Sequence, residues 1–183
     1  MDAPLDLVRP LIRTRQYRQF TGEPVSEDNL RALTEVARWS GSSRNSQPWR
    51  FIVVRDEPII RGLWQAGIPQ TRSLETAMAV IAIAMPQQQG ADSSWEGRAL
   101  SYAYDEGRVA ERILIAATLL DIGAGIAWLR PDVRSRAAEL LGLPDDRFVR
   151  TLMALGHPSP EARAPMSAPG EARLPAGEVV EWR

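Results

Sequence analysis

The sequence predicts an α+β domain, an α/β sandwich in which a central mixed β-sheet is surrounded by helices. Apolar patterns with a helical period alternate with short apolar runs through the middle of the chain, which is typical of one sheet packed against helices. The run 78–85 is apolar throughout and is stopped by Pro86, which indicates a strand covered on both faces. No repeat or linker divides the chain, so we expect a single domain over residues 1–183.

The helices are predicted from apolar faces and from capping residues. Ser26 is the expected N-cap of the second helix, and Glu27 and Asp28 suit the positive end of its dipole. The fourth helix has a second half that is apolar on all sides, so we expect it to run through the core. The expected helices, in order, are 5–15, 26–37, 56–64, 104–121 and 132–141.

Strands are expected where short apolar runs lie between turn residues. They cover 51–55, 78–85, 126–129 and 151–155, and the tail residues 179–182 are expected to add an edge strand. The segment 87–97 is a polar excursion between a strand and a helix.

Composition excludes several classes of function. The formal net charge of -1 argues against a general nucleic-acid-binding protein, which needs a basic surface. The absence of Cys excludes disulfides and thiolate chemistry, and the single His excludes a multi-His metal cluster, so we expect no metal. That residue, His157, follows an expected strand and is interpreted as structural rather than as a general base.

The chain shows no membrane or export signal. The longest apolar run, 113–120, is well short of the roughly 20 residues that span a bilayer. The first residues lack the basic start and apolar core of a signal peptide, so we expect a cytoplasmic protein without a membrane partner. Because side-chain reagents are scarce, any chemistry is expected to come from a bound cofactor.

The loop 41–49 concentrates directional polar groups. Its hydroxyls, carboxamides and guanidinium lie between an expected helix and an expected strand, next to Pro48 and Trp49. This density favours a loop that holds a planar ligand with polar edges. The alternative is a helix end followed by a turn, for which Gly, Ser and Asn are the usual residues.

Two further segments carry candidate binding groups. Arg13, Arg15 and Arg18 can clamp a phosphate, or they can form a solvated basic helix end. The glycines of 121–128 follow a helix and precede a strand, which is the reverse of a dinucleotide-binding fingerprint. We therefore interpret Gly123 as a helix C-cap and Gly125 as a place of close approach to something flat. Arg173 is isolated in a tail rich in Pro and Ala.

Taken in order, these residues resemble the nitroreductase superfamily. Arg15-x-x-Arg18-x-Phe20, followed by Ser42-Ser43-x-Asn45-x-Gln47-Pro48-Trp49, is similar to the N-terminal signature of that family. The likeness extends through the long helix from Tyr104, the segment 123–129 and the tail 173–182, and so covers nearly the whole chain.

The resemblance implies an FMN-dependent homodimer with two flavins at the subunit interface. Such enzymes pass hydride from NADH or NADPH through FMN to a nitroaromatic, a quinone or a similar small acceptor by a ping-pong cycle. Arg18 matches the cation beside the N1/O2 edge of the flavin and is the one catalytic candidate. The other implied cofactor-binding residues are Arg13, Thr14, Arg15, Gln16, Gly41, Ser42, Ser43, Asn45, Gly125, Ile126, Ala127, Trp128, Leu129 and Arg173.

Three positions depart from the family pattern. Thr14 replaces the first Arg of an Arg-Arg-Ser run, Gln16 replaces its Ser, and Gly41 replaces a common Pro. The departures at Thr14 and Gln16 motivate an alternative function on the same fold, a flavin-binding or deazaflavin-type ligand-binding or maturation protein without nitroreductase turnover. Nothing in the sequence selects NADH over NADPH or identifies the acceptor.

Overall fold

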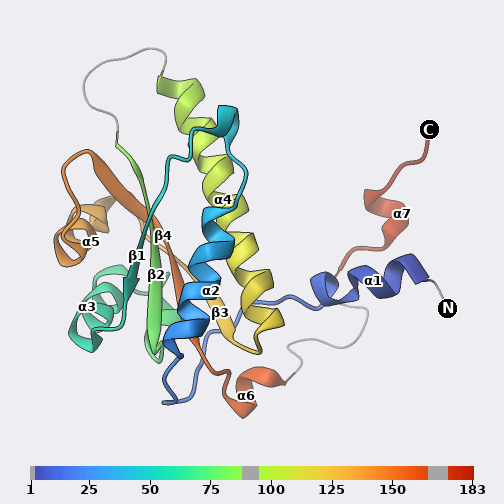
Figure 1. Ribbon diagram of the computed structural model, residues 1–183, viewed down its shortest axis with the longest axis horizontal. Coiled ribbons are helices and arrows are strands. Elements are labelled where there is room, and N and C mark those ends of the chain that lie inside the picture. Colours follow the sequence, from blue (N-terminus) through green and yellow to red (C-terminus); the bar gives the residue numbers. More distant parts are fainter. Residues whose placement is uncertain (1–2, 88–94, 165–172) are drawn as a thin grey trace.

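The computed structural model describes residues 3–87, 95–164 and 173–183, and one antiparallel sheet forms the centre of these residues (Figure 1). Its strands are β1 (Arg50–Val54), β2 (Ala79–Pro86), β3 (Gly123–Trp128) and β4 (Arg147–Gly156). They lie in the order β1-β2-β4-β3, and each neighbouring pair is antiparallel. The α+β class is confirmed, but the expected mixed sheet is corrected to an antiparallel one. The apolar run of β2 reflects burial on both faces of the strand. An antiparallel strand between two layers of helices has the same run as a parallel one, so the run does not fix the strand direction.

Helices cover both faces of the sheet (Figure 1). On one face lie α2 (Glu27–Arg38) and α4 (Trp95–Leu119), and on the other lie α3 (Glu57–Gly67) and α5 (Arg134–Leu141). Neighbouring residues of β2 point to opposite faces, so Ile81 joins the first core and Ala82 the second. This alternation explains why the whole strand is buried.

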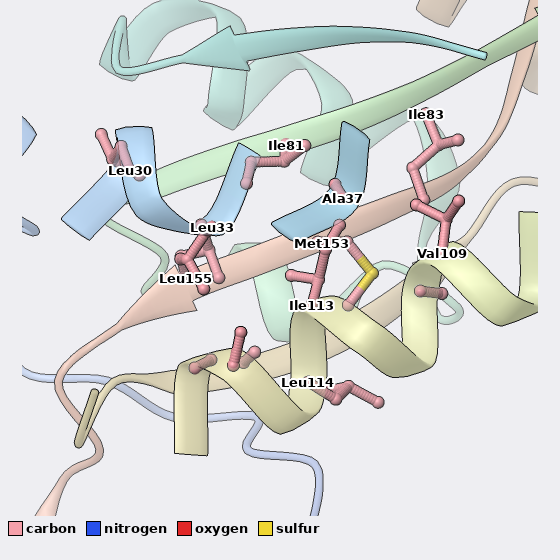
Figure 2. Close-up of a cluster of buried hydrophobic side chains, with 14 of the residues drawn as sticks. Leu30, Leu33, Ala37, Ile81, Ile83, Val109, Ile113, Leu114, Met153 and Leu155 are labelled. Carbon is pink, nitrogen blue, oxygen red and sulfur yellow. The ribbon is translucent and has the colours of Figure 1, made fainter. Parts of the chain in front are cut away.

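The larger core lies between α2, α4 and the sheet (Figure 2). Leu33 of α2 and Ile113 of α4 approach Met153 and Leu155 of β4 there, and all four side chains are fully buried. Truncating such a buried Leu to Ala costs about 2–5 kcal/mol, because transfer energy and packing contacts are both lost. This core fixes α4 against the sheet and thereby the surfaces that α4 presents on its other sides.

Side-chain caps set where α2 and α3 begin. The hydroxyl of Ser26 accepts a hydrogen bond from the backbone N–H of Asn29 at 3.2 Å, which confirms the expected N-cap. Asp56 caps α3 in the same way, since its carboxylate accepts from the N–H of Ile59 at 3.0 Å. Each cap satisfies a donor that the first helical turn leaves unpaired.

Several boundaries differ from the sequence-based expectations. Helix α1 spans Ala3–Ile12 and ends before 15. Asp121, with a φ of 54°, takes the left-handed position after α4, whereas Gly123 begins β3, so the predicted cap at Gly123 is wrong. Most of the polar excursion, 88–94, lies outside the described residues, and α4 begins at Trp95 rather than at 104.

The C-terminal segment forms no strand over 173–183. Helix α7 spans Ala176–Val179, and the residues after it are exposed, so the expected edge strand is wrong. An alternating apolar pattern needs a neighbouring strand to pair with, and no strand of the described sheet pairs with this segment. In Figure 1 both α1 and α7 project away from the body formed by the sheet and its helices.

The remaining short elements connect the larger ones. Three 3₁₀ turns, η1, η2 and η3, and the short helix α6 complete the described chain. They span Ser43–Asn45, Arg72–Leu74, Pro131–Val133 and Pro160–Arg163. The predicted helix over 132–141 is therefore divided between η3 and α5.

Candidate flavin site

The segment that follows α1 runs beside β3, an edge strand of the sheet. The backbone N–H of Tyr17 donates to the carbonyl oxygen of Ala124 at 2.8 Å. The N–H of Ile126 donates to the side-chain carbonyl of Gln16 at 3.2 Å. A Cβ on Gly125 would lie 2.0 Å from the carbonyl oxygen of Tyr17, so a larger residue cannot take this place without movement. The backbone of Tyr17 thus makes a close approach at Gly125.

A cavity of about 410 Å³ opens beside this segment. It is lined by Gln16 and Arg18, which the sequence predicted, and by Arg72 of η2, which it did not. Two guanidiniums that line one cavity suit the carbonyl-rich edge of a planar ligand, because Arg offers several donors in one plane.

Carboxylates also line this cavity, so it has both positively and negatively charged side chains. Glu75 and Glu161 also line it. The backbone N–H of Glu161 itself, and then the Ser159 hydroxyl, lower the pKa of Glu161. This carboxylate therefore stays ionised at neutral pH and adds negative charge to the cavity that Arg18 and Arg72 line.

Ser73 adds a polar group beside the same region. Its side chain is buried, and its hydroxyl has no hydrogen-bond partner in the part of the chain that the structure describes. The Cβ of Ser73 lies 3.2 Å from the position that a Cβ of Gly125 would occupy. Leaving a buried hydroxyl unpaired costs about 1–3 kcal/mol, so this group is suited to a ligand atom or a water.

Arg15 is already engaged within the chain. Its guanidinium donates to the carbonyl oxygens of Ala162, Arg163 and Ala164 at 3.0, 2.6 and 3.1 Å, and it lies 4.8 Å over the ring of Tyr17. It therefore caps the C-terminal carbonyls of α6. These contacts use the guanidinium of Arg15 and so compete with its predicted binding of a phosphate.

The other predicted phosphate contacts do not line the cavity. Arg13 is exposed, and the hydroxyl of Thr14 donates back to the carbonyl oxygen of Pro10 at 3.3 Å. Arg173 is exposed at the start of the C-terminal segment and is not among the residues that line the cavity. The structure thus brings Gln16 and Arg18 together and leaves these three residues apart from them.

The loop with Gly41, Ser42, Ser43 and Asn45 lies on α4 instead. The N–H of Ser43 donates to the buried carboxylate of Asp105 at 2.9 Å, and Arg108 lies 3.7 Å from the same carboxylate. Ser42 accepts from the N–H of Gln47 at 2.9 Å. These contacts fix the loop against the helix, away from the residues that line the cavity at Arg18.

The loop backbone is held in an unusual conformation. Arg44, Asn45 and Gln47 have φ values of 53°, 54° and 45°, in the left-handed region that residues with a Cβ rarely adopt. Each such residue costs of order 1 kcal/mol or more unless its surroundings hold it there. A loop that keeps three of them is specified in detail, which favours a binding role over a simple turn.

The residues at the end of β3 differ in burial. Ala127 and Leu129 are fully buried under α3 and α5, so only their backbones can reach a ligand. The ring of Trp128 is partly exposed, and the guanidinium of Arg134 lies 5.6 Å from its centre.

Searches for other kinds of site give negative results within the described ranges. Over residues 3–87, 95–164 and 173–183, no cluster of three His, Asp or Glu side chains is arranged to bind a metal ion. None of the described helices is long and apolar enough to cross a membrane.

Comparison with known proteins places the chain in a family. The model of the nitroreductase family matches residues 12–96. A Thermus thermophilus protein named NADH dehydrogenase is 30% identical over 98% of this chain and 97% of its own length. The chain belongs to the nitroreductase family.

Other relatives agree with that membership. The NADPH-flavin oxidoreductase of Vibrio harveyi is 26% identical over 94% of this nitroreductase-family chain and 72% of its own length. A Desulfovibrio desulfuricans protein, solved in complex with FMN, superposes with a TM-score of 0.73. That superposition covers 97% of this chain and 96% of the other at 23% identity, and at this identity it shows the fold.

Three residues of the candidate site were not predicted from the sequence. Arg72 and Ser73 lie in a polar stretch without periodicity, and nothing local marks them as neighbours of β3. Asp105 lies on the long helix that was predicted, and a carboxylate in a helix that runs through the core is a signal that could have been used.

Proposed function

We propose that this chain is an FMN-dependent oxidoreductase that passes hydride from NADH or NADPH to a nitroaromatic, a quinone or a similar small acceptor by a ping-pong cycle. Bound FMN supplies the hydride chemistry, and the protein supplies binding, orientation and charge. The single observation that carries the proposal is the cavity that Arg18 and Arg72 line together. The flavin-linked names of the relatives support it.

Arg18 is proposed to stabilise negative charge at the N1/O2 edge of the flavin. A preorganised cation lowers the energy of the charge that develops during reduction and so raises the reduction potential. Arg72 would share this role, while Gln16 and the backbone of Ile126 border the ring. The exposed face of Trp128 and the backbone from Gly125 to Leu129 are proposed to lie along the ring near N5.

The loop 41–45 is proposed to serve the flavin of a partner subunit. Within one protomer this loop rests on α4 and does not line the cavity at Arg18, yet its conformation is fully specified. A second copy would bring Ser42, Ser43 and Asn45 to the ring from the other side. The motif therefore implies a homodimer.

Exposed apolar side chains support the dimer. Leu7 of α1 is 83% exposed and Trp182 of the C-terminal segment is 92% exposed. Both segments project from the body of the protein (Figure 1). Apolar groups on projecting arms favour association with another chain. Light scattering on the purified protein should give twice the chain mass, and a monomer at micromolar concentration would contradict this part of the proposal.

The phosphate of FMN is proposed to meet Arg13, Thr14, Arg15 and Arg173. Arg15 would have to release the α6 carbonyls or share its donors with them, whereas Arg13 is exposed at the end of α1. Titrating the protein with FMN while following flavin fluorescence tests binding directly. Saturable quenching is expected, and riboflavin, which lacks the phosphate, should bind more weakly.

The contacts of Arg15 with the carbonyl oxygens at the end of α6 favour a second candidate function. If its guanidinium stays on α6, the phosphate grip is weaker than in a standard family member. The protein would then bind a flavin or a deazaflavin-type ligand without turnover. Mass spectrometry of the extracted chromophore, together with a test of reduction by each nicotinamide, separates the two functions. The cytoplasmic location and the single domain over 1–183 stay predictions.

A further inference from the structure

A second, larger cavity lies where β3 has ended. β3 pairs with β4 from Gly123 opposite Gly156 to Trp128 opposite Thr151, so residues 147–150 of β4 continue beyond it. Helices α4 and α5 flank this part of β4 and enclose about 710 Å³. None of the residues that line this cavity lines the candidate flavin cavity. We call it the β4-end pocket.

A buried carboxylate faces the β4-end pocket with one oxygen unused. Glu106 of α4 is 2% exposed, and its Oε2 accepts a short hydrogen bond from Arg150. Its Oε1 has no hydrogen-bond partner among the described residues. A buried carboxylate oxygen strongly favours a donor, because desolvation without a partner is costly. The pocket therefore calls for an O–H or N–H group at this point.

Three half-buried arginines line the pocket, and Glu106 is its one buried carboxylate. Arg134 donates from Nε to the carbonyl oxygen of Leu129 at 3.1 Å and forms no ion pair within the described ranges. Burial, and then the positive charge of Arg150, lower the pKa of Arg134. Arg147 also lines the pocket, and its buried Nε lacks a partner in the described part of the chain. An anion would relieve this repulsion.

The remaining charged groups lie at the rim. Glu139 and Asp145 line the pocket but are exposed, and Glu139 pairs with Arg136 at 2.9 Å. An aromatic surface lies between the cations, since the guanidiniums of Arg134 and Arg150 are 5.5 and 5.9 Å from the ring of Phe148. The pocket thus combines cations, one acceptor and a flat apolar wall.

We propose that the β4-end pocket binds a small organic carboxylate that also carries an O–H or N–H donor. The ligand carboxylate pairs with Arg134, its donor meets Oε1 of Glu106, and its apolar part lies against Phe148. Cavities of roughly 300–1,000 Å³ are the usual size for such ligands. The pocket shares no lining residue with the cavity at Arg18, but Arg134 lies 5.6 Å from the ring of Trp128, which is proposed to border the flavin. The binding proposed here does not require the flavin.

Three small probes test the chemistry by isothermal titration calorimetry on the full chain. 3-Hydroxybenzoate carries both groups and cannot bond its hydroxyl to its own carboxylate, benzoate lacks the donor and 3-hydroxybenzamide lacks the charge. We expect 3-hydroxybenzoate to bind and each of the other two to bind about tenfold or more weakly, since each loses a charge-assisted hydrogen bond. Absence of binding by 3-hydroxybenzoate at millimolar concentration would overturn the proposal.

Variants then locate the binding. Arg134→Met and Glu106→Gln should each weaken the binding of 3-hydroxybenzoate about tenfold or more. Arg136→Met, on the same helix but outside the pocket, and Arg18→Ala should leave it unchanged. Glu106→Gln breaks a buried ion pair and can destabilise the fold. Arg134→Met removes no ion pair seen in the described chain, so it carries the test by itself. Binding that survives Arg134→Met, or that is lost in Arg18→Ala, overturns the proposal.

Discussion

The carboxylate of Asp105 accepts a hydrogen bond from the backbone N–H of Ser43 at 2.9 Å. Asp105 is 1% exposed, so this bond joins a loop on the surface to a charge buried on α4. It holds the loop in the left-handed conformation described above. The relationship explains how a polar, strained loop keeps one conformation, as its proposed contact with a partner's flavin requires.

Replacing Asp105 with Ala should therefore loosen the loop. The N–H of Ser43 would lose its acceptor and Arg108 its ion pair, at a cost of about 1–3 kcal/mol in the free energy of unfolding. FMN affinity should fall as well. Asp105→Asn keeps an acceptor oxygen and should largely restore both. Urea unfolding and FMN titration are the measurements. Unchanged FMN affinity in Asp105→Ala would show that the loop does not serve the flavin.

Arg18→Ala and Arg72→Ala test the shared cation role. Losing a charge-assisted contact of about 1.5–3 kcal/mol corresponds to roughly 30–65 mV for a two-electron couple. The flavin potential should fall by this order in each variant, and the rate of reduction should fall with it. Arg31→Ala, whose guanidinium pairs with Glu27 on the exposed side of α2, is the matched control. A potential that does not move in Arg18→Ala would place the cation elsewhere.

Gly125→Ala should separate the N-terminal segment from β3. The new Cβ would clash with the carbonyl oxygen of Tyr17, and the backbone must shift, at a cost of about 1–3 kcal/mol. Gly97→Ala meets no atom within 4 Å and should be neutral or slightly stabilising. Chemical denaturation of both variants checks this, and equal stabilities would refute the close approach.

The pair of Glu35 with Arg38 predicts an acid-dependent contribution to stability. Hydrogen bonds from Arg38, and then from Trp39, lower the pKa of Glu35 from 4.5 to about 2. A depressed folded-state pKa means that this stabilisation is present above pH 4.5 and is lost as the pH falls towards 2. The carboxylate is exposed, so the effect should be small. The difference in thermal midpoint between the wild type and Glu35→Gln should be present at pH 6 and absent near pH 2.

Much of the fold follows from local pattern. The N-cap at Ser26 is set by neighbouring residues, and the structure has it as expected. Strand direction and pairing depend on distant segments, which is why the sheet was expected to be mixed and the tail to be a strand. The start of α4 was missed because its first turns, unlike its second half, are largely polar.

The candidate site, too, could be predicted only where local sequence marks its residues. Arg18 and the loop 41–45 are marked by dense polar motifs, so the sequence indicates them. Arg72 joins Arg18 only because η2 folds against β3, which no local pattern reports. Arg15 caps α6 through residues almost 150 positions away in the chain. The local sequence therefore could not show that this guanidinium, predicted to bind a phosphate, is already engaged within the chain.

The most direct test of the proposed function is the anaerobic absorbance spectrum of the purified protein, reconstituted with FMN, before and after adding NADH or NADPH. We expect a bound flavin band that bleaches with at least one nicotinamide and returns when a quinone or nitroaromatic acceptor is added. A protein that takes up no FMN, or whose bound FMN neither nicotinamide reduces, would contradict it.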